Sequence, residues 1–263
     1  MILQDIINII ESVAPLSYQE SWDNSGLQVG DRNAEIHAAL LTVDVTESVV
    51  DEAIEKHCDL IISHHPLLFR GLKQLTGSTP QERCVEKAIR HNIAIYSSHT
   101  SMDAYLHGVS GKIAEKLGIT NYRILSPSTT EQNVGLGVIG DLKAPMESEL
   151  FIRLVQQTFD CSLRYIAPSR AEVKTIAICG GAGAEFIPVA IAQGADVYIT
   201  ADVKYHEMQG ACGQIGIIDL DHWTSEHFTR EIFQELLHKQ VTTYIATSDV
   251  TPVKWLIKQN ETI

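Results

Sequence analysis

The sequence predicts an α/β protein with mainly parallel or mixed sheets, and two observations lead to this prediction. Short apolar stretches rich in strand-forming residues, such as 37–43 and 59–63, alternate with stretches of helical periodicity, such as 47–57 and 80–91. Strands separated by helices of this length are typical of βαβ units, whose strands run parallel. The same alternation resumes after residues 121–131, which indicates a second α/β region.

The first region is expected to contain four helices and three strands. An amphipathic helix opens the chain, because Asp5 and Glu11 interrupt an otherwise apolar segment that lacks a basic start. The last helix of the region closes at Gly118, a residue type that favours helix C-caps. In chain order the expected helices are 1–15, 47–57, 80–91 and 109–118, and the expected strands are 37–43, 59–63 and 93–98.

Residues 121–131 collect Ser, Thr, Pro and Asn, which is typical of a connection between domains. The expected strands after it are 134–142, 162–167, 173–179, 197–200, 215–221 and 242–248; the expected helices are 147–159, 184–193 and one long amphipathic helix, 224–239. The first and last parts of the chain could form one discontinuous domain. The division that we predict is a metal-binding α/β domain at 1–125 plus 221–263 and a second α/β domain at 126–220.

Composition restricts the class of protein. The 263 residues carry 20 basic and 33 acidic side chains, a formal net charge of −13, so extensive binding to nucleic acid or to anionic membranes is not expected. No apolar stretch approaches the roughly 20 residues of a membrane span. The five scattered cysteines include no CxxC pair, which favours a reducing compartment and a cytoplasmic location.

Side chains suited to metal binding follow three of the predicted strands. Since ligands of open α/β sheets bind beyond the carboxyl ends of the strands, we expect these side chains to share a site. Imidazole and carboxylate together suit Zn²⁺, Mn²⁺, Fe²⁺ or Co²⁺, and a bridging carboxylate could hold two ions. The candidates are His64 and His65 after the strand 59–63, His99 and Asp103 after 93–98, and His222 and Glu226 after 215–221.

Each of these residues also has a purely structural interpretation. A His-His pair is common at strand ends, Asp103 could cap a helix, and Glu226 in a first helical turn is favoured by the helix dipole. The coincidence of three clusters favours the metal site.

Three other segments have two interpretations each. The Gly-rich stretch 179–183 could present amides to a phosphate or could serve only as a tight turn. Lys204 and His206 could contact an anionic ligand or could begin a solvated helix. The loop Trp22–Gly30 is expected to be structural, although Asn24 or Gln28 could face a substrate.

Five collinear motifs in this chain resemble the Nif-three-like proteins with a dinuclear metal centre, also called GTP cyclohydrolase 1 type 2 homologues. The motifs are WDNSGLQVG, SHHP, SSHTSMDA, TADVKYHE and DHWTSEHF. The resemblance implies the Nif-three-like fold of two related α/β domains, here without an inserted middle domain, assembled into a toroidal homohexamer. It implies two divalent ions per chain, zinc first, with manganese, iron or magnesium as alternatives. The implied ligands are His64 and Asp103 on one ion, His65 and His222 on the other, and a bridging Glu226.

The family name implies conversion of GTP to 7,8-dihydroneopterin triphosphate and formate by a metal-activated water. His99 then becomes the expected proton shuttle, because an imidazole can give and take a proton near neutral pH. Lys204 and His206 become the expected contacts of the triphosphate. Two alternatives remain: hydrolysis of a phosphate ester by the same two ions, and a hexameric metal-binding or interaction protein without turnover.

Overall fold

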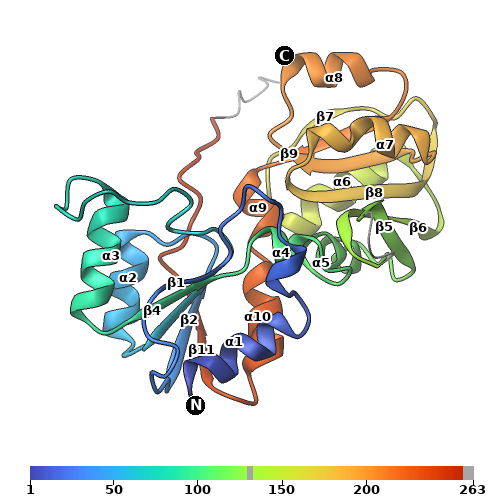
Figure 1. The fold of residues 1–263 in the computed structure, drawn as a ribbon. Coiled ribbons are helices and arrows are strands. Elements are labelled where there is room, and N and C mark those ends of the chain that lie inside the picture. Colours follow the sequence, from blue (N-terminus) through green and yellow to red (C-terminus); the bar gives the residue numbers. More distant parts are fainter. Residues whose placement is uncertain (129–132, 257–263) are drawn as a thin grey trace.

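The computed structural model describes residues 1–128 and 133–256, which form two β-sheets flanked by helices (Figure 1). Both sheets combine parallel and antiparallel strands, so the predicted α/β class with mainly parallel or mixed sheets is confirmed. In the described part of the chain, no helix has the length and apolar character needed to cross a membrane.

The first sheet has five strands in the order β1-β4-β3-β2-β11, and all of them except β1 run parallel. Its middle strands are buried on both faces, as parallel strands covered by helices should be. In this order the strands are β1 (Gly26–Val29), β4 (Ala94–Ser97), β3 (Leu60–Ser63), β2 (Ala38–Thr42) and β11 (Thr242–Ile245).

Two helices cover each face of the first sheet (Figure 1). Alternate residues of β2 point to opposite faces: Leu40 packs with α2 and α3, whereas Leu41 packs with α1 and α10. The four helices are α1 (Leu3–Glu11), α2 (Glu47–Glu55), α3 (Pro80–Arg90) and α10 (Thr229–Leu237). Thr46 and Thr79 cap α2 and α3 by accepting hydrogen bonds from the first-turn amides of Val49 and Glu82.

The second sheet has six strands in the order β5-β6-β8-β9-β10-β7. Strands β8, β9 and β10 run parallel, and the remaining pairs are antiparallel. In this order the strands are β5 (Tyr122–Pro127), β6 (Gly135–Glu147), β8 (Glu172–Ala182), β9 (Val197–Ala201), β10 (Gly216–Leu220) and β7 (Arg164–Ile166). The predicted domain boundary at 125/126 would fall within β5. The division into these two domains stays a prediction.

Helices cover this sheet on both faces as well. Val109 and Phe151 are buried against one face, whereas Ile187 and Ala211 are buried against the other. The helices are α5 (Val109–Lys116), α6 (Ser148–Phe159), α7 (Ile187–Ala192) and α8 (Tyr205–Ala211). Four shorter turns connect the elements: η1 (Leu16–Tyr18), α4 (Thr100–Asp103), η2 (Ala184–Phe186) and α9 (His222–Glu226).

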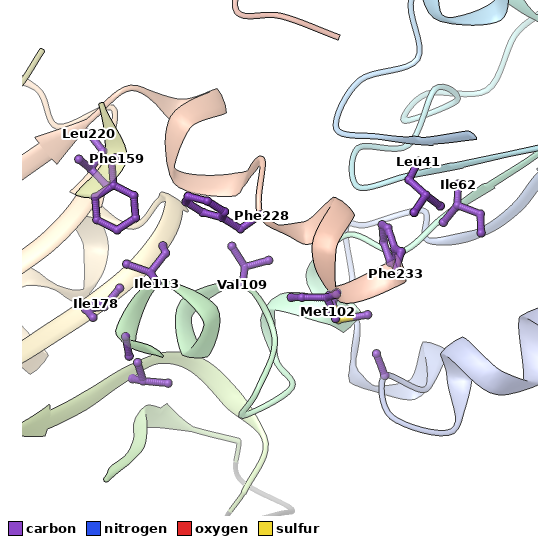
Figure 2. Close-up of a cluster of buried hydrophobic side chains, with 14 of the residues drawn as sticks. Leu41, Ile62, Met102, Val109, Ile113, Phe159, Ile178, Leu220, Phe228 and Phe233 are labelled. Carbon is purple, nitrogen blue, oxygen red and sulfur yellow. The ribbon is translucent and has the colours of Figure 1, made fainter. Parts of the chain in front are cut away.

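One apolar core joins the two sheets. Figure 2 shows it running from Leu41 and Ile62 of the first sheet, past Phe233 and Phe228, to Ile178 of the second. All of these side chains are at most 8% exposed. Because a packed interior deforms little, this shared core fixes the position of one sheet relative to the other.

The prediction of one long helix at 224–239 is wrong, because the structure has two helices in this region. Helix α9 ends at Glu226, and α10 begins at Thr229. Side chains hydrogen-bond the carbonyls at this break: Thr229 Oγ1 donates to the carbonyl of Glu226 at 2.6 Å, and Arg230 Nε donates to that of His227 at 2.9 Å. The amphipathic pattern continues across the break, so it could not reveal the interruption.

A buried carboxylate holds the segment that follows β11. Glu52 of α2 is 7% exposed and accepts hydrogen bonds from the amides and hydroxyls of Thr247 and Ser248 and from Lys56. Burial alone would raise the pKa of the Glu52 carboxyl. The hydrogen bonds from Lys56, Ser248 and Thr247 outweigh this effect and hold the pKa well below its ordinary value.

We expect Glu52→Gln to lower the free energy of unfolding by about 1–3 kcal/mol at pH 7, because several buried donors lose a charged acceptor. The folded-state pKa lies below that of the unfolded chain, so this contribution is present above about pH 4.5 and is lost as the pH falls toward the folded-state pKa. Urea denaturation at pH 7 and pH 4 measures both effects. Glu55→Gln, an exposed change on the same helix, serves as the control, and equal stability of the two variants at pH 7 would contradict the prediction.

Candidate metal centre

The candidate site lies where the carboxyl edges of the two sheets meet. His64 directly follows β3, His99 lies two residues beyond β4, and His222 begins α9 just after β10. The first two come from the first sheet and the third follows the second sheet. The predicted placement of all three histidines at strand ends is therefore observed.

Glu226 occupies the centre of the cluster. Its carboxylate is buried, and its Oε2 atom lies 2.9 Å from His65 Nε2 and 3.1 Å from His222 Nε2. Its other oxygen, Oε1, lies 3.6 Å from His64 Nε2, which is in turn 3.7 Å from Asp103 Oδ1. The structure thus brings together all five residues predicted as metal ligands, with each oxygen of Glu226 facing a different histidine set.

Every histidine of the cluster is oriented through its Nδ1 atom. His65 Nδ1 lies 2.9 Å from Asp44 Oδ1, and His222 Nδ1 lies 2.6 Å from Asp202 Oδ2. The Nδ1 of His64 lies 3.1 Å from a main-chain acceptor, the carbonyl of residue 98. An Nδ1–H that donates to such an acceptor leaves Nε2 with a free lone pair, as in metal-binding histidines.

The cluster contains polar atoms that its own side chains do not satisfy. His64 Nε2, Asp103 Oδ1 and Glu226 Oε2 are buried and lack a hydrogen-bond partner in the described part of the chain. Glu226 Oε2 lies close to two imidazole nitrogens but forms no aligned hydrogen bond with them. Buried polar atoms are otherwise almost always paired, so these three atoms fit a divalent cation bound among them. Nitrogen and carboxylate donors of this kind suit Zn²⁺, Mn²⁺ or Fe²⁺.

The carboxylates dominate the electrostatics of the site. Burial opposes the charged form of His65, but its hydrogen bond to Asp44 and the nearby carboxylate of Glu226 raise its pKa to about 10. For His222, the nearby carboxylate of Glu226 is the main cause of a pKa raised to about 9. Desolvation raises the pKa of Asp103. Protons and cations therefore compete for the same nitrogens, and binding of a metal ion must release protons.

His99 is held by a buried acid, Asp23. The side chain of Asp23 is fully buried, and its Oδ1 atom lies 2.9 Å from His99 Nδ1. It also accepts hydrogen bonds from the amides of Asn24 and Thr100 and from the hydroxyls of Ser25 and Thr100. The Nε2 of His99 is the ring nitrogen that Asp23 leaves free, and one ring nitrogen of His99 lies within 4.8 Å of ligand atoms of His64 and His65.

The Gly-rich stretch 179–183 spans the end of β8 and the residue after it, and it supports the cluster through its backbone. Its amides are already used: those of Gly180, Gly181 and Gly183 donate to side-chain hydroxyls of Ser110, Ser225 and Thr200. These bonds argue against the phosphate-binding interpretation. Gly181 has φ +65°, and a Cβ placed there would lie 2.2 Å from Glu226 Oε1.

The other candidates lie elsewhere. Lys204 and His206 are exposed at the start of α8, and no hydrogen bond or ion pair joins them to the cluster within residues 1–128 and 133–256. Asn24 and Gln28 brace two loops: Asn24 Nδ2 donates to the carbonyl of Leu68, whose amide donates to Gln28 Oε1. The roles of Lys204 and His206 in binding a substrate stay predictions.

A sequence profile of the family described as Duf34/NIF3 (NGG1p interacting factor 3) matches residues 1–253. The chain belongs to this family. A protein of Clostridium perfringens named GTP cyclohydrolase 1 type 2 homolog is 37% identical over 228 residues, which cover 86% of this chain and 87% of the relative. A protein of Clostridium acetobutylicum with the same name is 35% identical and covers 85% of both chains.

Solved structures of other proteins share the fold. A Staphylococcus aureus hypothetical protein superposes with a TM-score of 0.90 at 28% identity, covering 97% of this chain and 99% of its own. Reduced HcgD from Methanocaldococcus jannaschii gives a TM-score of 0.78 at 27% identity, covering 93% and 97% of the two chains. The predicted membership of the Nif-three-like family and its fold are thereby confirmed.

Sequence reasoning assigned no site role to the three acids that orient the histidines of this family member. Asp44 and Asp202 follow strands β2 and β9 and so carry the same strand-end signal as the predicted ligands. Asp23 lies in the WDNSG motif, 76 residues from His99, and only the fold brings the two together. In the sequence, only its place in the distinctive WDNSG motif could have marked Asp23 as a site residue.

We expect Gly181→Ala to reduce binding of divalent metal ions at least twofold, because the new Cβ would displace the Glu226 carboxylate. Gly194→Ala is the matched control: Gly194 also has a positive φ, +76°, but no atom lies within 4 Å of the added Cβ. Both variants carry a similar backbone strain of about 1–2 kcal/mol. Elemental analysis of the purified variants gives the ion content, and equal content in the two would contradict this role of Gly181.

Proposed function

We propose that the cluster binds two divalent metal ions and that the chain is a metal-dependent hydrolase acting on a guanine nucleotide. The observation that carries the proposal is the set of three buried, unpaired ligand atoms, His64 Nε2, Asp103 Oδ1 and Glu226 Oε2. A cluster of charged and polar atoms buried without partners would cost several kcal/mol if nothing bound there.

The distances support the expected division of ligands. His64 and Asp103 would hold one ion, His65 and His222 the other, and Glu226 would bridge, because its two oxygens face these two sets. Two bound ions would lower the pKa of a water molecule and neutralise charge developing on an oxygen-rich substrate. We expect zinc first, although manganese, iron or magnesium would satisfy similar donors.

GTP is the substrate suggested by the names of the relatives, and ring opening with release of formate is the corresponding reaction. In this proposal His99 Nε2 carries the proton between substrate and solvent, while Asp23 holds the ring through Nδ1. Lys204 and His206 remain the expected triphosphate contacts. The toroidal homohexamer and the cytoplasmic location implied above belong to the same proposal.

The metal hypothesis predicts about two divalent ions per chain in protein purified without chelators, and fewer than one in Glu226→Ala. The substitution removes the acid whose two oxygens face His64 on one side and His65 and His222 on the other. Elemental analysis gives both values, and Glu172→Ala, an exposed change at the start of β8, serves as the control. An ion content near zero in the wild type that added zinc or manganese does not restore would refute the dinuclear site.

For the reaction, we expect metal-loaded wild-type protein to release formate from GTP and His99→Ala to do so at least 100-fold more slowly with its metal content intact. His238→Ala, an exposed histidine that follows α10, should match the wild type. A loss of less than threefold in His99→Ala would remove the proton-shuttle role. Release of phosphate in place of formate would favour the phosphoesterase, and neither product from the two-metal protein would favour a binding protein without turnover.

A further inference from the structure

We propose that a cavity beside the metal cluster binds a planar, guanine-type ring, with the indole of Trp22 as its stacking surface and the carboxylates of Glu20 and Glu185 as hydrogen-bond acceptors. This inference rests on the proposed function, because it names the part of the molecule that would select the base. No motif in the sequence indicated where a purine would bind.

The cavity has the size of a small-molecule site. Its volume is about 580 Å³, within the usual range of about 300–1,000 Å³ for ligand pockets. Residues from both halves of the fold line it, including Glu20, Trp22, Ala104, Leu136, Glu185 and Phe186. Serine, glutamine and glutamate side chains line it alongside the aromatic and apolar ones, so it offers both stacking and hydrogen bonding.

Two lining residues of this cavity, Trp22 and Ala104, connect it to the metal cluster. Trp22 lies next to Asp23, and its ring centroid is 6.0 Å from that of His99. Ala104, which also lines the cavity, directly follows the predicted ligand Asp103 in the chain. A ring in the cavity would therefore lie beside the residues that we expect to carry out the chemistry.

Trp22 has the properties of a preformed stacking surface. Its side chain is 57% exposed although it is large and apolar. The backbone that carries it is fixed by the buried carboxylate of Asp23, and a second aromatic ring, Phe69, lies 5.9 Å away at a tilted angle. An exposed aromatic ring on a fixed backbone loses little conformational entropy when a ligand stacks on it.

The two acids provide the selectivity for guanine. Neither Glu20 nor Glu185 has a side-chain hydrogen bond or ion pair with any residue that the structure describes. A carboxylate accepts hydrogen bonds only, and guanine offers two adjacent donors, N1–H and the N2 amino group. Adenine places an unprotonated nitrogen at the corresponding position, so a carboxylate discriminates against it.

A second cavity, of about 720 Å³, is itself lined by His65 of the cluster. Its lining includes the acids Asp44, Glu47 and Asp249, and contains no Trp, Tyr or Phe among the described residues. It therefore offers no stacking surface for a base, and the negative charges disfavour a phosphate there.

Binding of guanosine and adenosine, measured by isothermal titration calorimetry, tests the proposal. Guanosine lacks the triphosphate and can be titrated into metal-loaded and metal-free protein, so base recognition is measured apart from turnover. The test variants are Trp22→Ala, Trp22→Phe and the double variant Glu20→Gln with Glu185→Gln. The matched controls are Tyr165→Ala, an exposed aromatic residue of β7, and Glu172→Gln.

We expect guanosine to bind the wild type at least tenfold more tightly than adenosine. Trp22→Ala should weaken both nucleosides at least fivefold, Trp22→Phe should retain most of the affinity, and the double variant should lose the preference for guanosine. The controls should match the wild type. Guanosine binding without formate release would refute the proposed reaction and leave the base site standing.

Three results would overturn the base site itself. The first is no guanosine binding by either form of the wild type at millimolar concentration. The second is equal affinity in the wild type and Trp22→Ala. The third is a change in molar mass of Trp22→Ala by light scattering without loss of guanosine affinity, because Trp22 would then serve contact between copies of the chain.

Discussion

The arrangement of the site depends on one buried carboxylate, Glu226. A negative charge with 3% exposure is costly unless positive charge or a cation lies against it. Three imidazoles surround it, two from the loop after β3 and one from its own helix α9. Backbone of the second sheet approaches on the remaining side, where Gly181 leaves room for its Oε1 atom. The surroundings of Glu226 therefore come from both sheets, and the shared apolar core fixes the distance between these sheets.

The sequence was sufficient to predict which side chains the fold brings together in the cluster, because it repeats one signal. His64, His99 and His222 all follow apolar strands, and parallel strands bring their carboxyl ends to one edge. The same signal followed β2 and β9 at Asp44 and Asp202, but a sequence cannot tell a ligand from a residue that orients one. Asp44 and Asp202 orient because they contact the Nδ1 atoms of histidines whose Nε2 atoms face Glu226. Which ring nitrogen an acid contacts depends on side-chain geometry that only the folded chain defines.

Two features could not be predicted because they depend on contacts distant in sequence. Asp23 reaches His99 only after β1 pairs with β4, which places the WDNSG motif beside the end of β4. The break between α9 and α10 follows from side chains that hydrogen-bond the carbonyls of Glu226 and His227. Helical periodicity reports which face is buried, and that face hardly changes across the break.

The break also explains how one short segment serves the site and the core together. Helix α9 directs His222 and Glu226 toward the cluster, one turn apart on the same face. Beyond the break, Phe228 and Phe233 enter the core that joins the two sheets (Figure 2). Since these aromatic side chains fix the segment at its far end, the backbone that carries Glu226 cannot shift without disturbing the core. The position of the Glu226 backbone is thus set by packing, so a cation at the proposed site would find this carboxylate already in place.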